Sequence, residues 1–485
     1  MSAPVPSVAS VPPLREALER ARYSAGALMV DLGGDIDTDS GRAPRQAREL
    51  PENDRAELAR LFLLGQLVDT ERLAAALAPA TVDDLVDAQW LVRDGDAVRS
   101  PLRITPHEGV LLVHDELKVK QTDADVVLGR SSAANTLAAL TPREPVGTAL
   151  DVGTGCGIQA LLAAGHADRV VAVDVNQRAL DLTALGAALS GIDNVELLLG
   201  SWFEPVEGEQ FDLIVSNPPF VISPENDFVY RDGSGGRDEV SQLVVTEAAR
   251  HLAPGGVAEI LVNWVEDPFS SWIAPLQRWL DGAGVDALVL HHLSEQPVGY
   301  AAKWNMHLHG DPDEHGRVLD RWTAHFESEG ILTIATGAIT LRRSGQDPVL
   351  FTGLSMESAP GGRAGRHTVR LLDAARWLDT VTDEELMATE MALVDDHRLV
   401  SERVHYEGEY GEDEVRIMLA DNAGVNGELG AAAAAVLIGV EGGSTPADAV
   451  PGLAAAIPEM HTADAEHLVV ATVRDLVSRG LLVRR

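Results

Sequence analysis

The chain opens with segments whose apolar residues recur at helical spacing. Three segments place apolar side chains three and four positions apart, which predicts amphipathic helices: Glu52–Gly65, Val68–Leu77 and Thr81–Leu91. The next segment, Leu91–Val98, reads as a β-hairpin because its Asp-Gly pair suits a type I′ turn. Helices followed by a hairpin predict a winged-helix-like N-terminal module over residues 14–104. The Pro/Ser/Ala-rich residues 1–13 are expected to form a disordered tail.

From residue 105 the pattern changes to short apolar runs that alternate with helical segments. The strand-like runs are Gly147–Val152, Arg169–Val173, Val195–Leu199, Phe211–Ser216, Val257–Val262, Val285–His292 and one or two within Ile331–Arg343. This alternation is typical of βαβ units and a parallel sheet, so residues 105–345 are expected to form an α/β domain. Residues 346–366 read as a linker, and residues 367–485 as a mainly helical C-terminal module.

Composition narrows the classes of function. The net charge of −37 disfavours non-specific binding to nucleic-acid phosphates. The single cysteine, Cys156, leaves no internal disulfide framework. No apolar run approaches the ~20 residues of a membrane span, and no basic-then-apolar leader is seen at the N-terminus. We therefore expect a cytoplasmic protein without membrane association.

A glycine-rich turn follows the first strand of the predicted α/β domain. It reads Asp151-Val-Gly153-Thr154-Gly155-Cys-Gly157 and leads at once into a helix. Glycines let the backbone pass close to a ligand, but they also satisfy the G-x-G-x-x-A pattern of NAD-binding proteins. The acid at Asp151 favours the ammonium of a methionine moiety, because it would repel a pyrophosphate.

Two later segments are placed to complete a nucleoside site. Asp174 ends the second strand, where its carboxylate can accept both ribose hydroxyls, and Asn176 is expected to support the same turn. Ser201 and Trp202 follow the third strand, near the expected adenine edge, although Trp202 fits a plain core position equally well. Cys156 is expected to pack under the cofactor rather than to act as a nucleophile.

The most specific segment is Asn217-Pro218-Pro219-Phe220, which ends an apolar strand. The prolines fix the backbone and remove N–H donors. The Asn217 side-chain oxygen and the Pro218 carbonyl can then accept both hydrogens of an NH2 group, and Phe220 can stack on the planar group that carries it. Such positioning directs the nitrogen lone pair at an electrophilic methyl without a strong base.

Together these motifs resemble the class I S-adenosylmethionine (SAM)-dependent methyltransferases with an Asn-Pro-Pro-Phe/Tyr motif. This group includes the release-factor glutamine and ribosomal-RNA guanine-N2 methyltransferases. The resemblance covers about residues 110–343 and implies a Rossmann-like seven-stranded sheet. It also implies that Asp151, Gly153, Gly155, Gly157 and Asp174 hold SAM, and that Asn217 and Pro218 hold the target nitrogen.

Three weaker features surround these motifs. The glycine-rich Tyr230–Asp238 resembles a loop of the glutamine methyltransferases and reads equally well as a substrate lid or as a solvated loop. Arg130-Ser131-Ser132 are expected to line the SAM pocket from above. The histidines lack acidic or cysteine companions at metal spacing, so we expect no metal site.

The two ends of the chain resemble each other. Thr81–Arg93 aligns without gaps on Thr472–Arg484, and both read as an amphipathic helix that leads into a short strand. The acids of the N-terminal copy outweigh its arginines, which disfavours a phosphate-facing surface. We therefore expect the terminal modules to shape the substrate cleft or to form a homodimer, and not to bind duplex DNA.

The sequence as a whole predicts a SAM-dependent N-methyltransferase. The expected acceptor is a planar amide or exocyclic amine, in an RNA nucleobase or a protein glutamine, with a peptide or small metabolite as the alternative. Readings from other classes are an NAD(P)-linked oxidoreductase, which Asp151 and Asn217 disfavour, and an inactive SAM-fold scaffold, which the intact motif disfavours.

Overall fold

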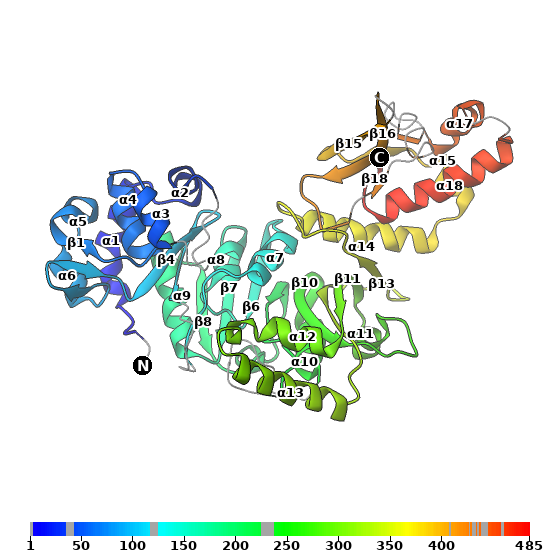
Figure 1. Cartoon of the computed structure of the whole chain (residues 1–485). Coiled ribbons are helices and arrows are strands. Elements are labelled where there is room, and N and C mark those ends of the chain that lie inside the picture. Colours follow the sequence, from blue (N-terminus) through cyan, green and yellow to red (C-terminus); the bar gives the residue numbers. More distant parts are fainter. Residues whose placement is uncertain are drawn as a thin grey trace. The chain divides into compact units, whose positions relative to one another are not determined.

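A computed structural model gives the arrangement of the chain (Figure 1). It describes residues 3–34, 43–116, 125–224, 237–406, 409–425, 427–428, 433, 436–437, 445–456 and 460–485. The chain divides into two compact units. The first comprises residues 1–138, 144–283 and 294–336, and the second comprises residues 139–143, 284–293 and 337–485.

The N-terminal part of the first unit is built from short helices and a small sheet. Its elements are η1 (Val8–Ser10), α1 (Val11–Arg20), α2 (Ala25–Leu32), α3 (Ala43–Glu49), α4 (Asp54–Leu58), the π-helical η2 (Ala59–Leu63), β1 (Val68–Asp69), α5 (Thr70–Leu77), α6 (Val82–Asp87), β2 (Val92–Asp94), β3 (Ala97–Arg99), β4 (Leu102–His107) and β5 (Val110–Asp115). The first three strands form an antiparallel sheet of order β1-β3-β2, and β4 pairs with β5 across the predicted domain boundary at residue 104.

Three predictions for this part need correction. The prediction of a disordered tail is wrong from Val8 onward, where η1 and α1 begin. Pro12 and Pro13 fit the first turn of α1, because a missing N–H there costs no hydrogen bond. The second predicted helix begins at Thr70, since Asp69 accepts backbone N–H groups there as its N-cap. The hairpin is confirmed, but its turn is not type I′: Gly95 alone has a positive φ, and type I′ requires two such residues.

The central sheet has eight strands in the order β13-β11-β12-β10-β9-β6-β7-β8. The run from β10 to β8 is parallel, as the alternating pattern predicts. The prediction of seven strands is wrong because Phe351–Ser355, inside the predicted linker, forms β13 parallel to β11. The glycines and prolines around this short run concealed it in the sequence.

The elements of this region, in chain order, are α7 (Ser132–Leu140), β6 (Val146–Val152), α8 (Ile158–Ala163), β7 (Ala167–Asp174), α9 (Gln177–Ser190), β8 (Val195–Leu199), η3 (Glu204–Val206), β9 (Phe211–Ser216), α10 (Glu239–His251), β10 (Leu252–Val265), α11 (Ala274–Trp279), β11 (Asp286–Glu295), α12 (Pro297–Trp304), η4 (Met306–Leu308), α13 (Pro312–Ser328), β12 (Ile334–Arg342) and β13 (Phe351–Ser355). Helix α8 packs on β6 and β7, α9 packs on β7 and β8, and α10 packs on β9 and β10. The predicted site residues lie at or just after the carboxyl ends of β6, β7, β8 and β9.

The C-terminal module is mixed rather than mainly helical. Its elements are α14 (Gly365–Thr380), α15 (Asp383–Ala388), β14 (Met391–Leu393), β15 (His397–Tyr406), β16 (Glu409–Leu419), β17 (Gly427–Glu428), η5 (Pro446–Ala449), α17 (Val450–Ala456), α18 (Thr462–Ser478) and β18 (Leu482–Arg484). Strands β15, β16 and β17 form one antiparallel sheet, and β14 pairs with β18 in another. The sequence did not predict β15 and β16 because charged residues interrupt the apolar alternation that marks a strand.

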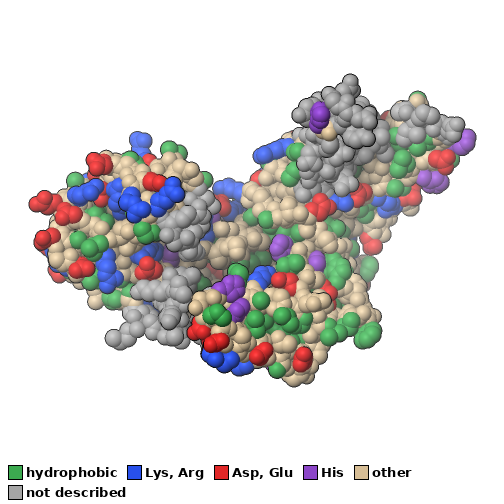
Figure 2. All heavy atoms as spheres, viewed as in Figure 1, with side chains coloured by type: hydrophobic (Ala, Val, Ile, Leu, Met, Phe, Trp, Pro, Cys, Tyr) green, Lys and Arg blue, Asp and Glu red, His purple; other side chains and the backbone are tan. Residues whose placement is uncertain are grey.

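Charge is spread over the surface of the N-terminal part. On the face drawn in Figure 2, acidic and basic side chains are interspersed there. Exposed ion pairs of this part include Arg15 with Glu19 and Arg45 with Glu49. Such pairs contribute little to stability, about 0–1 kcal/mol each.

Candidate active site

The glycine-rich turn connects β6 to α8 in a conformation that only glycine adopts without strain. Gly153, Gly155 and Gly157 have φ values of +76°, +56° and +80°. At Gly157 a side chain is also excluded by space, since an added Cβ would lie 2.6 Å from the Thr183 methyl group. The Thr183 hydroxyl donates to the Gly155 carbonyl at 3.1 Å, which ties the turn to α9.

Asp151 is the buried acid of this turn, with 1% of its surface exposed. Its Oδ2 accepts the Thr154 hydroxyl at 2.7 Å and the Ala160 N–H at 3.0 Å. Among the described residues, Oδ1 accepts no hydrogen bond. Burial raises the pKa of Asp151 to about 7, against the opposing effect of the two hydrogen bonds. The carboxylate therefore shapes the turn and would gain from a nearby cation.

Asp174 joins the end of β7 to the glycine-rich turn. Its Oδ2 accepts the Gly155 N–H at 2.9 Å, and its Oδ1 accepts the Asn176 N–H at 2.9 Å. Asn176 in turn caps α9 by accepting the Arg178 N–H at 3.0 Å. Burial raises the pKa of Asp174 as well. Asn176 thus links the end of β7 to the start of α9.

These segments surround one cavity of about 390 Å³. Nine of the predicted site residues line it: Asp151, Gly153, Thr154, Gly155, Asp174, Asn176, Trp202, Asn217 and Pro219. Its volume lies in the ordinary range of small-molecule sites. The glycines leave room for a ligand, two acids lie near the turn, and the Asn217 amide follows the neighbouring strand β9, so the cavity offers groups that fit those of SAM.

Four predicted site residues do not line the cavity. Gly157 faces Thr183, and Ser201 lies beside the cavity-lining Trp202. Pro218 is buried, and the Phe220 ring packs edge-on against Trp304 with 6.4 Å between centroids. That Phe220 stacks on the acceptor therefore stays a prediction.

Cys156 lines the cavity but is suited to packing. Its side chain is buried, and burial raises the pKa of the thiol to about 12. The thiol is therefore protonated at neutral pH, and a protonated thiol is a poor nucleophile.

Sequence reasoning missed one wall of the cavity. Residues 126–129 line it, together with Ala134 and Gln159. Of Arg130, Ser131 and Ser132, which were expected to line the pocket, only Ser131 does so. Gln159 holds this wall in place, because its Nε2 donates to the Ala134 carbonyl at 2.9 Å. Gly129 leaves no room for a side chain, because an added Cβ there would lie 2.5 Å from the His114 ring, a contact that no local sequence pattern predicts.

A second missed feature supports the loop after Asn217. The Ile222 N–H donates to the Tyr300 hydroxyl at 3.0 Å, and Asn263 Nδ2 donates to the same oxygen at 2.7 Å. Tyr300 and Asn263 are fully buried. They come from α12 and β10, far apart in sequence, so no local pattern predicts their meeting.

Some predictions concern features away from the cavity. Most of Tyr230–Asp238, the predicted lid or loop, lies outside the described residues. Within the described part of the chain, no group of three or more His, Cys, Asp or Glu side chains is arranged to hold a metal ion. No helix of that part is long and apolar enough to span a membrane.

Comparison with known proteins identifies three regions. Residues 131–268 match the methyltransferase small domain, and residues 13–101 and 370–484 match two domains of unknown function, DUF7059 and DUF7782. The ribosomal protein uL3 glutamine methyltransferase of Bordetella pertussis is 30% identical over 45% of this chain and 82% of its own length.

Two further relatives match shorter stretches. The release factor glutamine methyltransferase of Xylella fastidiosa is 32% identical over 29% of this chain, which spans 50% of that relative's length. The ribosomal RNA small subunit methyltransferase C of Cronobacter sakazakii is 33% identical over 26% of this chain and 34% of its own length. The resemblance that the motifs indicated is thereby confirmed.

Proposed function

The chain belongs to the class I SAM-dependent methyltransferases, and we propose that it methylates the nitrogen of a planar amide or exocyclic amine. One observation carries the proposal: Asn217 lines the same 390 Å³ cavity as Asp151 and Asp174. Bound SAM would supply the electrophilic methyl group. Asn217 and the Pro218 carbonyl would accept the two N–H hydrogens of the acceptor, which orients its lone pair toward that methyl.

Asp174 and Asp151 would bind different groups of SAM. Asp174 keeps its carboxylate at the cavity wall while Gly155 and Asn176 fix its orientation, so it would accept the ribose hydroxyls. Asp151 would attract the methionine ammonium across the glycine-rich turn. Trp202 would lie against the adenine. It lines the cavity with φ +52°, a conformation costly for a bulky residue and common at functional sites.

Protein glutamine is our first candidate for the acceptor. Two of the relatives described above are named as glutamine methyltransferases, and the net charge of −37 opposes the approach of an RNA backbone. A nucleobase amine in RNA is the second candidate, supported by the 33% identity to a ribosomal-RNA methyltransferase.

Replacement of Asn217 tests the proposed chemistry. Asn217→Ala removes the acceptor for the target NH2 group but leaves the glycine turn intact. We expect SAM affinity within about twofold of the wild type and methyl transfer reduced about 10²–10³-fold. The assay is transfer from tritiated SAM into fractionated protein and RNA pools of a deletion strain. Asn135→Ala, at an exposed position of α7, is the matched control. Transfer at the parental rate in Asn217→Ala would exclude the residue from the reaction.

The pH dependence of SAM binding tests the role of Asp151. In the free protein its pKa of about 7 means that the carboxyl is protonated, and neutral, at lower pH. Only the carboxylate attracts an ammonium, so SAM affinity should rise with pH between about 6 and 8. Asp151→Asn should remove this rise and lower the affinity at pH 8. Isothermal titration measures the pH dependence and the affinity at pH 8. If the same titration shows binding of NAD and none of SAM, the cofactor assignment is wrong.

The terminal modules are assigned by their element order. We propose that residues 14–104 contain a winged-helix-like module, supported by the succession α4-β1-α5-α6-β2-β3 and the sheet order β1-β3-β2. The matches to residues 13–101 and 370–484 support modules that flank the methyltransferase domain of residues 105–345. We further propose that neither module binds duplex DNA, in keeping with the net charge of −37.

A further inference from the structure

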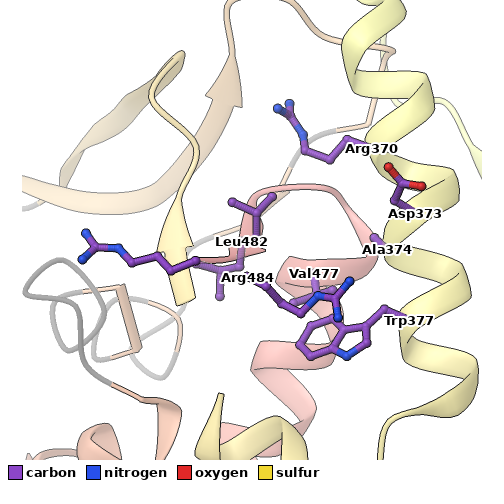
Figure 3. A pocket seen from close by; sticks show the side chains of 9 residues that line it. Arg370, Asp373, Ala374, Trp377, Val477, Leu482 and Arg484 are labelled. Atoms are coloured by element: carbon purple, nitrogen blue, oxygen red, sulfur yellow. The ribbon is translucent and has the colours of Figure 1, made fainter. Parts of the chain in front are cut away.

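The C-terminal module contains a groove of about 450 Å³ between α14 and β18 (Figure 3). One wall is a single face of α14, since its lining residues Arg370, Asp373, Ala374 and Trp377 recur at helical spacing. The opposite wall consists of the consecutive residues 482–485, and Val477 of α18 closes the floor. All of these residues belong to the second compact unit.

The groove runs along an edge of β18 rather than over one of its faces. Successive side chains of a strand point to opposite faces, so a cavity lined by four consecutive residues lies beside the strand's edge. The other edge is paired with β14: the Arg485 N–H donates to the Glu390 carbonyl at 3.1 Å, and the Val394 N–H donates to the Leu481 carbonyl at 3.1 Å.

This pairing fixes which backbone groups face the groove. In an antiparallel pair, hydrogen-bonded and non-hydrogen-bonded residues alternate. The bonds at Leu481 and Arg485 therefore turn the N–H and C=O groups of Leu482 and Arg484 away from β14. Among the described residues no strand pairs with this second edge. It offers donors and acceptors in alternation.

Positive charge gathers at the same place. Arg370 is half-buried, its Nε has no hydrogen-bond partner in the described structure, and burial lowers its pKa. The Arg484 guanidinium lies 5.0 Å from the centre of the Trp377 ring. Figure 3 shows both side chains at the groove. Among the described residues that line the groove, Asp373 is the only acid, and it is engaged in an ion pair with Arg342. Asp396 acts on Arg370 by its charge but does not line the groove. Cationic groups thus remain available in a chain of net charge −37.

We propose that this groove binds an extended, acidic peptide segment of a partner protein, which adds a strand to the open edge of β18. A peptide main chain matches the alternating donors and acceptors of Leu482 and Arg484, and its acidic side chains match Arg370 and Arg484. A polynucleotide fits less well, because phosphates satisfy N–H groups only and Arg484 already covers the Trp377 ring that a base would stack on. The proposal is independent of methyl transfer.

Peptide selection on the full chain tests this inference. A phage-displayed library of random dodecapeptides is selected on the wild type and counter-selected on the double variant Arg370→Gln/Arg484→Gln. Enriched peptides are synthesised, and their affinities are measured by fluorescence polarisation. We expect the enriched peptides to share an Asp or Glu at one position. Their affinity should fall about tenfold or more in Arg370→Gln and in Arg484→Gln. Methylation of alternate peptide nitrogens should abolish binding, because it removes main-chain hydrogen bonds.

Matched controls separate the groove from general charge and from misfolding. Arg474→Gln alters an arginine of the same module that is paired with Asp383 and does not line the groove, so its peptide affinity should be unchanged. Thermal unfolding confirms that each variant is folded. The inference is overturned if no peptide is enriched, if enriched peptides lack acids or tolerate backbone methylation, or if oligouridylate binds through the same arginines.

Discussion

In both terminal modules a helix stops at a residue in the left-handed region, Gln89 in the N-terminal module and Gly480 in the C-terminal one. Their φ values are +68° and +64°, and the two positions correspond in the alignment of Thr81–Arg93 with Thr472–Arg484. The same three backbone N–H to carbonyl hydrogen bonds close each helix. In the N-terminal module they run from Ala88 to Asp84, from Gln89 to Val86 and from Trp90 to Leu85. In the C-terminal module they run from Arg479 to Asp475, from Gly480 to Val477 and from Leu481 to Leu476.

Burial also corresponds along the two segments. Leu85 and Leu476 are each 1% exposed, and Leu91 and Leu482 are 2% and 1% exposed. Each helix leads into a strand, as the repeat predicted. What differs is the partner of that strand: β2 pairs with β3, whereas β18 pairs with β14. Local sequence thus specifies the helix stop and the buried side chains, while strand pairing depends on the rest of the module.

The largest effect should come from emptying the shared core position. Leu85→Ala and Leu476→Ala each remove a fully buried side chain, which typically costs about 2–5 kcal/mol. Hydrogen exchange should show faster opening of α6 in the first variant and of α18 in the second. If only one of the two variants changes the exchange of its own helix, the two segments do not pack equivalently.

A smaller loss is expected where the C-terminal module depends on glycine. In Gly480→Gln the new residue would have to adopt the left-handed region, and its Cβ would lie 3.0 Å from the His367 ring. The left-handed conformation costs about 1–2 kcal/mol, and the close contact adds to it. Hydrogen exchange of α18 measures the loss. If α18 exchanges at the same rate or more slowly in the variant, its stability does not depend on glycine at position 480.

The reciprocal change should be mildly favourable. Gln89→Gly relieves a left-handed conformation at an equivalent helix stop, which should stabilise α6 by about 0.5–1 kcal/mol. Urea titration followed by hydrogen exchange of α6 measures the gain. A destabilised α6 would mean that the Gln89 side chain makes contacts that outweigh its backbone strain.

The sequence predicted the elements that depend on local pattern. The bounds of β8 and β9 match the predicted runs, and the glycine turn with Asp151 and Asp174 lies at the cavity as expected. It did not predict β13 or the long hairpin of β15 and β16, whose strands are specified by distant partners. The cavity wall at residues 126–129 and the contact of Tyr300 with Ile222 were missed for the same reason.

The burial of Cys156 has a practical consequence for redox chemistry and labelling. Because burial raises the thiol pKa to about 12, the thiol is protonated at pH 7, so alkylating reagents and peroxides should react slowly at this position. Cys156 is also the only cysteine of the chain. The native protein can therefore serve directly as a background for site-specific spin or fluorophore labels at introduced cysteines, and pairs of such labels would report the distance between its two units in solution.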